Sequence, residues 1–405
     1  MANGVIKNLK GFGPLVKSVT GRMKIAKQGD GVIPPLDSHL QNRIKNALHP
    51  VRQHLVVTDI IEHSADVKTF VLGPDASRGT TTLGYPMAGQ YICIKLTVGG
   101  ARISRPYSLS SSPKEAAEGH YSLTIKRVDG GICSGYVLDN WQVGSKVAAS
   151  APLGVFTYEP LRDAHTVVGI AGGSGITPFF SLAKAIADGD EDCDLVLLYG
   201  SRTQADILFL PQFNELEQRT SGRFRLVNVL SDQQVEGCEY GFITADLIRK
   251  YAPNVGDYSV FLCGPQGMYN FVDRELAKLN LRPKFIRHEL FGEYHHPENN
   301  TDYPQAAKGQ TFALHVKVLD KHYDITCRAD ETILNAMEHN GIIAPSECRS
   351  GVCGACHSRL ISGTVYVPAS VDGRRMADLQ FGYVHPCCTF PTSDVSIDVP
   401  GNNNC

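Results

Sequence analysis

The stretch "SECRSGVCGACHSRL" (residues 346–360) contains three closely spaced cysteines: Cys348, Cys353 and Cys356. Their spacing is C-x4-C-x2-C, and the adjacent pair Cys387 and Cys388 follows much later, in "HPCCTF". Three clustered thiolates and a distant fourth, Cys387, predict a [2Fe–2S] cluster. Small residues between the clustered cysteines allow a tight loop whose amides point at the sulfurs, which tunes the reduction potential.

Structural zinc is the competing interpretation of a four-cysteine set. Zinc sites usually contain paired C-x2-C knuckles, and this chain has one such short pair, which favours the cluster. In an extended segment, neighbouring side chains point to opposite faces. Only one of Cys387 and Cys388 can then face the cluster.

The length and composition are those of a multidomain globular protein. The chain has 405 residues, enough for two or three domains, with 42% hydrophobic and 20% charged residues. It contains neither an apolar run long enough to span a membrane nor a signal-peptide pattern. Twelve cysteines without a disulfide-like pattern favour a reducing, cytoplasmic location. We expect no nucleic-acid partner.

Residues 1–53 form a basic N-terminal arm. They carry nine basic side chains against two acidic ones, a net charge of +7, which leaves −9 for the rest of a chain whose total is −2. Several glycines and prolines argue against one long helix. The arm is interpreted either as a docking element for an acidic partner or a membrane surface, or as a solvated tail that folds over the domains.

The rest of the chain divides into four segments by its strand and helix patterns. Short alternating strands predict an antiparallel β-barrel over residues 54–160. Strands alternating with helices over 161–294 predict a doubly wound parallel sheet. The polar, proline-containing stretch 295–309 is predicted to be a linker. A hairpin, a short helix and the cysteine loop make up 310–400.

Two motifs in the first segment suit a flavin. "RPYSLSS" (105–111) offers a cation for a phosphate (Arg105), an aromatic face for the ring (Tyr107) and a hydroxyl near its reactive nitrogen (Ser108). "GGICSGY" (130–136) opens a predicted helix, whose N-terminal amides can bind a pyrophosphate. Each motif alone also fits an ordinary strand or turn.

Three motifs in the second segment follow predicted strands, where doubly wound sheets bind their ligands. They are "AGGSGITP" (171–178), "YGSRT" (199–203) and "FLCGPQGM" (261–268). The first is not the G-x-G-x-x-G dinucleotide fingerprint, but its glycines let a ligand approach the backbone. Cys263, taken alone, is better explained as a buried strand-end residue.

The order of these motifs, ending in "ELFG" (289–292), resembles the ferredoxin-NADP reductase superfamily over about residues 54–292. Together with the C-terminal ferredoxin-like segment, the resemblance extends to about residue 400. It implies a reductase component of the kind that serves oxygenases, hydroxylases and desaturases, with a β-barrel flavin domain, an α/β nucleotide domain and an α+β β-grasp ferredoxin domain. "GYVHPC" resembles the GY-x-x-x-C ending of plant-type ferredoxins, which selects Cys387 as ligand and leaves Cys388 a bystander.

The resemblance also implies site residues. The flavin is assigned to Arg105, Pro106, Tyr107, Ser108, Gly131, Ile132, Cys133 and Ser134. The nicotinamide nucleotide is assigned to Gly172, Gly173, Ser174, Gly175, Thr177, Ser201, Arg202, Cys263, Gly264 and Pro265. The hydride-transfer site is assigned to Ser108, Cys263, Glu289 and Phe291. The cluster is assigned to Cys348, Cys353, Cys356 and Cys387.

The redox chemistry predicts the order in which electrons pass through these sites. A hydride carries two electrons, a [2Fe–2S] cluster accepts one, and a flavin converts between the two. We therefore expect an NAD(P)H-dependent reductase that passes electrons through FAD and the cluster to a separate redox protein. A self-contained reductase of a small molecule or metal chelate is the alternative, and a non-catalytic redox-sensing or binding module is a third. FAD is favoured over FMN and NADH over NADPH, while the acceptor and the oligomeric state stay open.

Overall fold

The computed structural model describes residues 17, 19–24, 27, 39–48, 50–254, 256–290 and 294–401. The chain splits into two compact units, Met1–Asn46 and Ala47–Cys405. No helix within the described ranges is long and apolar enough to cross a membrane.

Much of the basic arm lies outside the described residues, so its role stays a prediction. The described part includes helix α2 (Leu40–Leu48). Leu40 and Ile44 are exposed one turn apart on this helix, beside the basic residues Arg43 and Lys45. Such a helix is compatible with the docking interpretation and with a tail.

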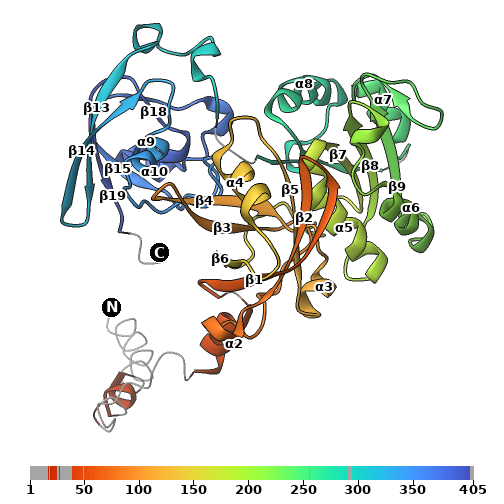
Figure 1. Cartoon of the computed structure of the whole chain (residues 1–405), viewed down its shortest axis with the longest axis horizontal. Helices are drawn as coiled ribbons and strands as arrows, with labels where there is room; N and C mark the ends of the chain where they lie inside the picture. Colours follow the sequence, from red (N-terminus) through yellow and green to blue (C-terminus); the bar gives the residue numbers. More distant parts are fainter. Residues whose placement is uncertain are drawn as a thin grey trace, which may run out of the picture. The chain divides into compact units, whose positions relative to one another are not determined.

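The first domain of the second unit is a curled, antiparallel six-stranded sheet in the order β4-β3-β6-β1-β2-β5 (Figure 1). Its strands are β1 (Gln53–Ser64), β2 (Val67–Pro74), β3 (Tyr91–Val98), β4 (Ala101–Ser108), β5 (Tyr121–Lys126) and β6 (Lys146–Ala149). Helices α3 (Pro113–Ala117) and α4 (Ile132–Asn140) follow β4 and β5. A bridge between Leu109 and Leu123 joins the end of β4 to β5. This curling confirms the antiparallel barrel predicted from the alternating strands.

The long Asp75–Ala88 connection is anchored to this barrel by the buried side chain of Gln53. The Gly84 amide donates to Gln53 Oε1 at 2.7 Å, and Gln53 Nε2 donates to the Ser150 carbonyl at 2.8 Å. The Tyr121 hydroxyl donates to the Gly84 carbonyl. The connection is thus part of the barrel's hydrogen-bonded structure.

The second domain is a parallel sheet in the order β10-β9-β8-β7-β11-β12. Its strands β7, β8 and β9 are labelled in Figure 1. The strands are β7 (Thr166–Gly172), β8 (Asp194–Ser201), β9 (Phe224–Leu230), β10 (Glu239–Tyr240), β11 (Tyr258–Cys263) and β12 (Ile286–Glu289). The helices are α5 (Thr177–Asp188), α6 (Leu210–Arg219), α7 (Ala245–Tyr251) and α8 (Gln266–Leu276). Separate apolar cores cover the two faces of the sheet, which confirms the doubly wound prediction. The strand order reverses between β7 and β11, the point at which such folds bind ligands.

The predicted linker, residues 295–309, packs against the third domain. Tyr303 and Ala307 are buried in a small apolar cluster that includes Tyr366. The side-chain amide of Asn300 donates to the Tyr366 hydroxyl at 2.9 Å. The segment is therefore ordered by contacts that its polar composition does not reveal.

The third domain is a mixed five-stranded sheet in the order β14-β13-β19-β15-β17, with a helix packed on it. The strands are β13 (Thr311–Val318), β14 (Lys321–Arg328), β15 (Ser358–Ser362), β17 (Tyr383–Val384) and β19 (Val395–Val399), with β16 (Val365–Tyr366) and β18 (Phe390–Pro391) forming a separate pair. The helices are α9 (Ile333–His339), which is capped by Thr332, and α10 (Met376–Phe381). The predicted hairpin and short helix are present, and the parallel β13–β19 pairing fits the predicted β-grasp.

Candidate flavin, nucleotide and cluster sites

Strand β4 carries the residues that the sequence assigns to the flavin. Along it, Pro106 and Ser108 are buried, whereas Arg105 and Tyr107 are partly exposed. Burial raises the pKa of the Tyr107 hydroxyl, so this phenol stays neutral. One strand thus presents a cation and a neutral aromatic ring on one face and a buried hydroxyl on the other.

Helix α4 begins directly after the predicted pyrophosphate turn. Gly131 is its N-cap and has no side chain to accept the first helical amides. The Ser134 hydroxyl accepts from the Val128 amide at 3.0 Å, which closes the turn. The helix N-terminus therefore combines amide donors with the positive end of the helix dipole, an arrangement that suits an anionic phosphate.

Three of the four predicted hydride-transfer residues meet, although they come from three strands. Cys263 and Glu289 are paired in register at the ends of β11 and β12. Burial raises the pKa of the Glu289 carboxyl well above its usual range, and a hydrogen bond with Ser108 opposes that shift. Burial, reinforced by Glu289, also raises the pKa of the Cys263 thiol. The fourth residue, Phe291, lies outside the described residues.

The Glu289 carboxyl also offers a test of whether this site fits a flavin. Its Oε2 atom is buried and has no hydrogen-bond partner among the described residues. A buried polar atom without a partner is rare in proteins. This atom therefore faces a position that suits a polar ligand group, next to the strand that carries Tyr107.

The glycine-rich turn after β7 packs closely against the end of β11. A methyl group added to Gly175 would overlap the Cys263 carbonyl and lie 2.8 Å from the Gly264 Cα. The Thr177 hydroxyl donates to the Ser174 carbonyl at 3.0 Å, which closes the turn into α5. Only a residue without a side chain fits at Gly175, so these two motifs form one surface.

A cavity of about 460 Å³ opens at the strand ends of the nucleotide domain. Five predicted nucleotide residues line it: Gly172, Gly173, Ser201, Arg202 and Pro265. Lys126, Asp206, Phe242 and Phe271 also line it, and sequence reasoning missed them. Lys126 comes from barrel strand β5, Asp206 and Phe242 come from strand–helix connections, and Phe271 lies in helix α8. The rings of Phe242 and Phe271 are 5.6 Å apart. No local motif marks them, because the folded sheet brings them together.

Gly175→Ala is expected to slow flavin reduction by NADH by about a hundred-fold, the cost of roughly a 1 Å misplacement at a reacting site. The added methyl must displace the end of β11, where Cys263 lies. Stopped-flow absorbance at saturating NADH measures the rate, with flavin and iron content as folding checks.

Cys193→Ala is the control, because Cys193 is buried in the same domain but precedes β8 and lies away from the strand ends that carry the site. A wild-type rate in Gly175→Ala would show that the close packing of this turn does not matter for hydride transfer.

The four predicted cluster ligands lie around one loop. Backbone amides point at the first two sulfurs: those of Ser350 and Cys353 lie 3.5 and 3.3 Å from Cys348 Sγ, and that of Ala355 lies 3.4 Å from Cys353 Sγ. Cys356 Sγ and Cys387 Sγ are 3.4 Å apart. Cys353 is exposed, and the other three ligands are buried. These thiols and amide donors fit a [2Fe–2S] cluster.

Across the described ranges, no group of three or more His, Cys, Asp or Glu side chains is positioned to hold a metal ion as the side chains stand. The four cysteines are therefore assigned as ligands from the geometry of their loop.

The side chains of the adjacent cysteines Cys387 and Cys388 point in different directions, but the backbone between them is not extended as expected. Residues Pro386–Cys388 form a 3₁₀ turn, so the prediction of an extended segment is wrong. Proline presets the backbone angle of a first helical position, which favours the turn. Cys387 faces Cys356, whereas Cys388 Sγ lies 3.4 Å from the His385 carbonyl and packs behind Gly351. This arrangement supports Cys387 as the ligand, which stays a prediction.

The cluster loop packs against the strand pair that carries the flavin motif. Cys348 forms a buried apolar cluster with Tyr91 and Cys93 of β3. In the β3–β4 register, Tyr91 is opposite Ser108 and Cys93 is opposite Pro106. One predicted cluster ligand is therefore only one strand away from the predicted flavin residues.

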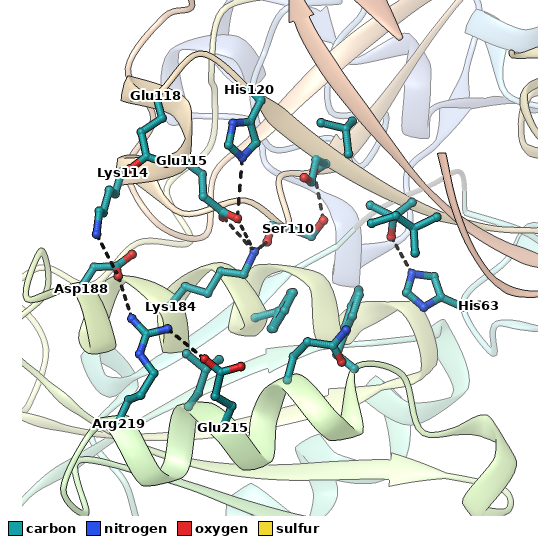
Figure 2. Close-up of a pocket in the computed structure, with 18 residues that line it drawn as sticks. His63, Ser110, Lys114, Glu115, Glu118, His120, Lys184, Asp188, Glu215 and Arg219 are labelled. Atoms are coloured by element: carbon teal, nitrogen blue, oxygen red, sulfur yellow. Dashed lines mark hydrogen bonds and ion pairs between the residues drawn. The ribbon is translucent and has the colours of Figure 1, made fainter. Parts of the chain in front are cut away.

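A second cavity, of about 540 Å³, contains none of the predicted site residues (Figure 2). Charged pairs cross it between α3 and α5 and between α5 and α6. Lys184 lies 2.8 Å from Glu115, and Asp188 lies 3.7 Å from Lys114 and 3.2 Å from Arg219 (Figure 2). The lysines and the arginine of this cavity are thus already paired with carboxylates, and the cavity is assigned no ligand.

The barrel, the parallel sheet and the cysteine loop define a flavin-dependent oxidoreductase with an iron–sulfur domain. Family models agree for each part: an oxidoreductase FAD-binding domain matches residues 54–158, an oxidoreductase NAD-binding domain 170–274, and a 2Fe-2S iron-sulfur cluster binding domain 316–392. The chain belongs to the ferredoxin-NADP reductase superfamily and carries a C-terminal [2Fe–2S] ferredoxin domain.

Individual relatives show how far the similarity extends. The glycine betaine monooxygenase reductase subunit of Pseudomonas aeruginosa is 28% identical over 373 residues, which cover 87% of this chain and 99% of the relative. NADH-cytochrome b5 reductase 1 of Candida glabrata is 31% identical over 229 residues, which cover 56% of this chain and 78% of the relative. The structure of phthalate dioxygenase reductase, at 21% identity, shares the fold with a TM-score of 0.60 over 86% of this chain and 98% of that one.

Proposed function

We propose that this protein is the reductase component of an oxygenase system. It takes electrons from a nicotinamide nucleotide and delivers them, through FAD and a [2Fe–2S] cluster, to a separate oxygenase. One observation carries the proposal: the cluster loop buries Cys348 against β3, the neighbour of the flavin strand β4, and exposes Cys353 to solvent. One side of the cluster is thus near the predicted electron donor, and the other is accessible to a second protein.

The residues around the flavin position have separate tasks. A bound flavin accepts an electron pair and releases electrons singly. Arg105 and the N-terminus of α4 neutralise its phosphates. Ser108 and Glu289 would offer the bound flavin a hydroxyl and a carboxyl whose pKa burial raises well above its usual range. The tight Gly175–Cys263 contact would shape the surface on which the nicotinamide binds.

NADH is the proposed donor. Arg202, the candidate partner for a 2′-phosphate, is already paired with Asp232 at 3.0 Å. Asp206 lines the same cavity. Carboxylates accept hydrogen bonds from a ribose 2′-hydroxyl and repel a 2′-phosphate, so this environment favours NADH.

A cytoplasmic location is also proposed. Four cysteines are assigned as cluster ligands, and no disulfide joins any of the described cysteines. Many cysteines without a disulfide are typical of a reducing compartment.

An anaerobic titration with NADH tests the function. We expect bleaching of both flavin and cluster absorbance, a weaker response to NADPH, and fast reduction of cytochrome c, which serves as a one-electron protein acceptor. Absence of any bleaching would support the non-catalytic module instead. Fast turnover of a ferric chelate that matches turnover of protein acceptors would support the self-contained reductase.

A further inference from the structure

A buried charged network connects the cluster loop to the flavin strand. Arg349 directly follows the predicted ligand Cys348, and its side chain is 0% exposed. Its two terminal nitrogens donate to the two carboxylate oxygens of Glu338, on α9, at 2.7 and 2.9 Å. It also donates to Asn335 Oδ1 at 2.6 Å. The loop next to a cluster ligand is thus held by a two-pronged ion pair.

The same network reaches the barrel. Arg349 Nη1 lies 3.5 Å from the Ser104 carbonyl of β4, and that carbonyl also accepts from Arg105 Nη1 at 3.0 Å. Glu338 Oε2 lies 3.8 Å from Arg105 Nη1. Helix α9 contacts β4 here. One carboxylate therefore stands between the cluster-loop arginine and the arginine assigned to the flavin phosphate.

We infer that Glu338 is a positioning residue for electron transfer from the flavin to the cluster. Two cations converge on this one carboxylate, and both it and Arg349 are buried. Breaking a buried pair leaves an uncompensated charge, which the protein relieves by moving it toward water. Without the Glu338 charge, Arg349 leaves its site and moves the Cys348 segment away from β3. The longer gap slows electron transfer, which falls steeply with distance.

This network also explains an unusual backbone position. Arg349 has a φ of 59°, in the left-handed region that residues with side chains rarely adopt. Such a conformation persists where surrounding contacts hold it. The four acceptor contacts of its guanidinium, on Glu338, Asn335 and Ser104, provide that restraint.

The test is Glu338→Gln in the full-length, flavin- and iron-loaded protein. After rapid mixing with NADH, flavin bleaching and cluster bleaching are followed in the same transient. We expect flavin reduction at the wild-type rate and cluster reduction slower by about ten- to a hundred-fold, the range typical of residues that orient metal ligands. Glu338→Asp, which keeps the charge, should recover part of the rate. Arg349→Lys, which keeps a charge but not the two-pronged geometry, should slow the same step.

Asp324→Asn is the matched control, since Asp324 forms an exposed pair with His315 in the same domain. An unchanged cluster-reduction rate in Glu338→Gln would overturn the inference. Loss of iron in that variant would overturn it too, because the network would then serve cluster binding. The inference rests on the proposed function, but different results contradict the two. Absence of flavin reduction by NADH in the wild-type protein would contradict the proposed function, whereas an unchanged cluster-reduction rate in Glu338→Gln would contradict only the inference.

Discussion

Cys387→Ser is expected to abolish the [2Fe–2S] cluster, whereas Cys388→Ser leaves it in place. Cys387 Sγ lies 3.4 Å from Cys356 Sγ, among the other predicted ligands. Cys388 Sγ instead lies 3.4 Å from the His385 carbonyl and behind Gly351. Removing one of four thiolates leaves an iron without its ligand, so the expected loss is complete. Iron content and the visible spectrum of both purified variants measure it.

The flavin provides the internal control for this pair of variants. Reduction of flavin by NADH should persist in Cys387→Ser, because the hydride site uses strands β4, β11 and β12. Reduction of cytochrome c should fall with the cluster, while ferricyanide, a small acceptor, should still be reduced. Iron lost from Cys388→Ser but kept in Cys387→Ser would reverse the ligand assignment.

Cys263→Ala is expected to slow flavin reduction by NADH by about ten- to a hundred-fold, with little change in flavin binding. Cys263 is paired with Glu289 at the ends of adjacent strands, and its backbone contacts the Gly175 turn. Burial raises the pKa of its thiol, so the neutral side chain acts through shape and position. Stopped-flow absorbance at saturating NADH measures the rate, and flavin fluorescence measures binding.

Cys193→Ala is the matched control for this substitution. Cys193 is also fully buried in the nucleotide domain, but it precedes β8 and lies away from the strand ends that carry the site. If Cys263→Ala and Cys193→Ala reduce flavin equally fast, Cys263 is only a packed strand-end residue.

The sequence by itself determined the class of protein. Two fold types followed from local patterns: alternation in the barrel and strand–helix alternation in the parallel sheet. Local patterns also predicted the hairpin before the cysteine loop, whereas the β-grasp fold was implied by the resemblance to ferredoxins. These features were readable because periodicity, turn residues and ligand spacing act over short stretches of chain. The order of weak motifs then carried more information than any one motif.

The tertiary structure decided which distant residues meet. Strand order and register place Ser108, Cys263 and Glu289 together, and they place Lys126 and Phe242 in the nucleotide cavity. Such contacts depend on sheet topology, for which no local pattern exists.

The contacts of the cysteine pair and of the cluster loop also involve residues that are distant in the sequence, so local patterns did not predict them. Pro386 favours the 3₁₀ turn locally, but the position of Cys388 behind Gly351 depends on packing that an isolated segment does not show. In sequence, Glu338 and Arg349 are ordinary charged residues on a helix and in a loop. Folding buries both side chains, and it places Arg349 beside the Ser104 carbonyl. Burial of the two charges is tolerated because each is the ion-pair partner of the other.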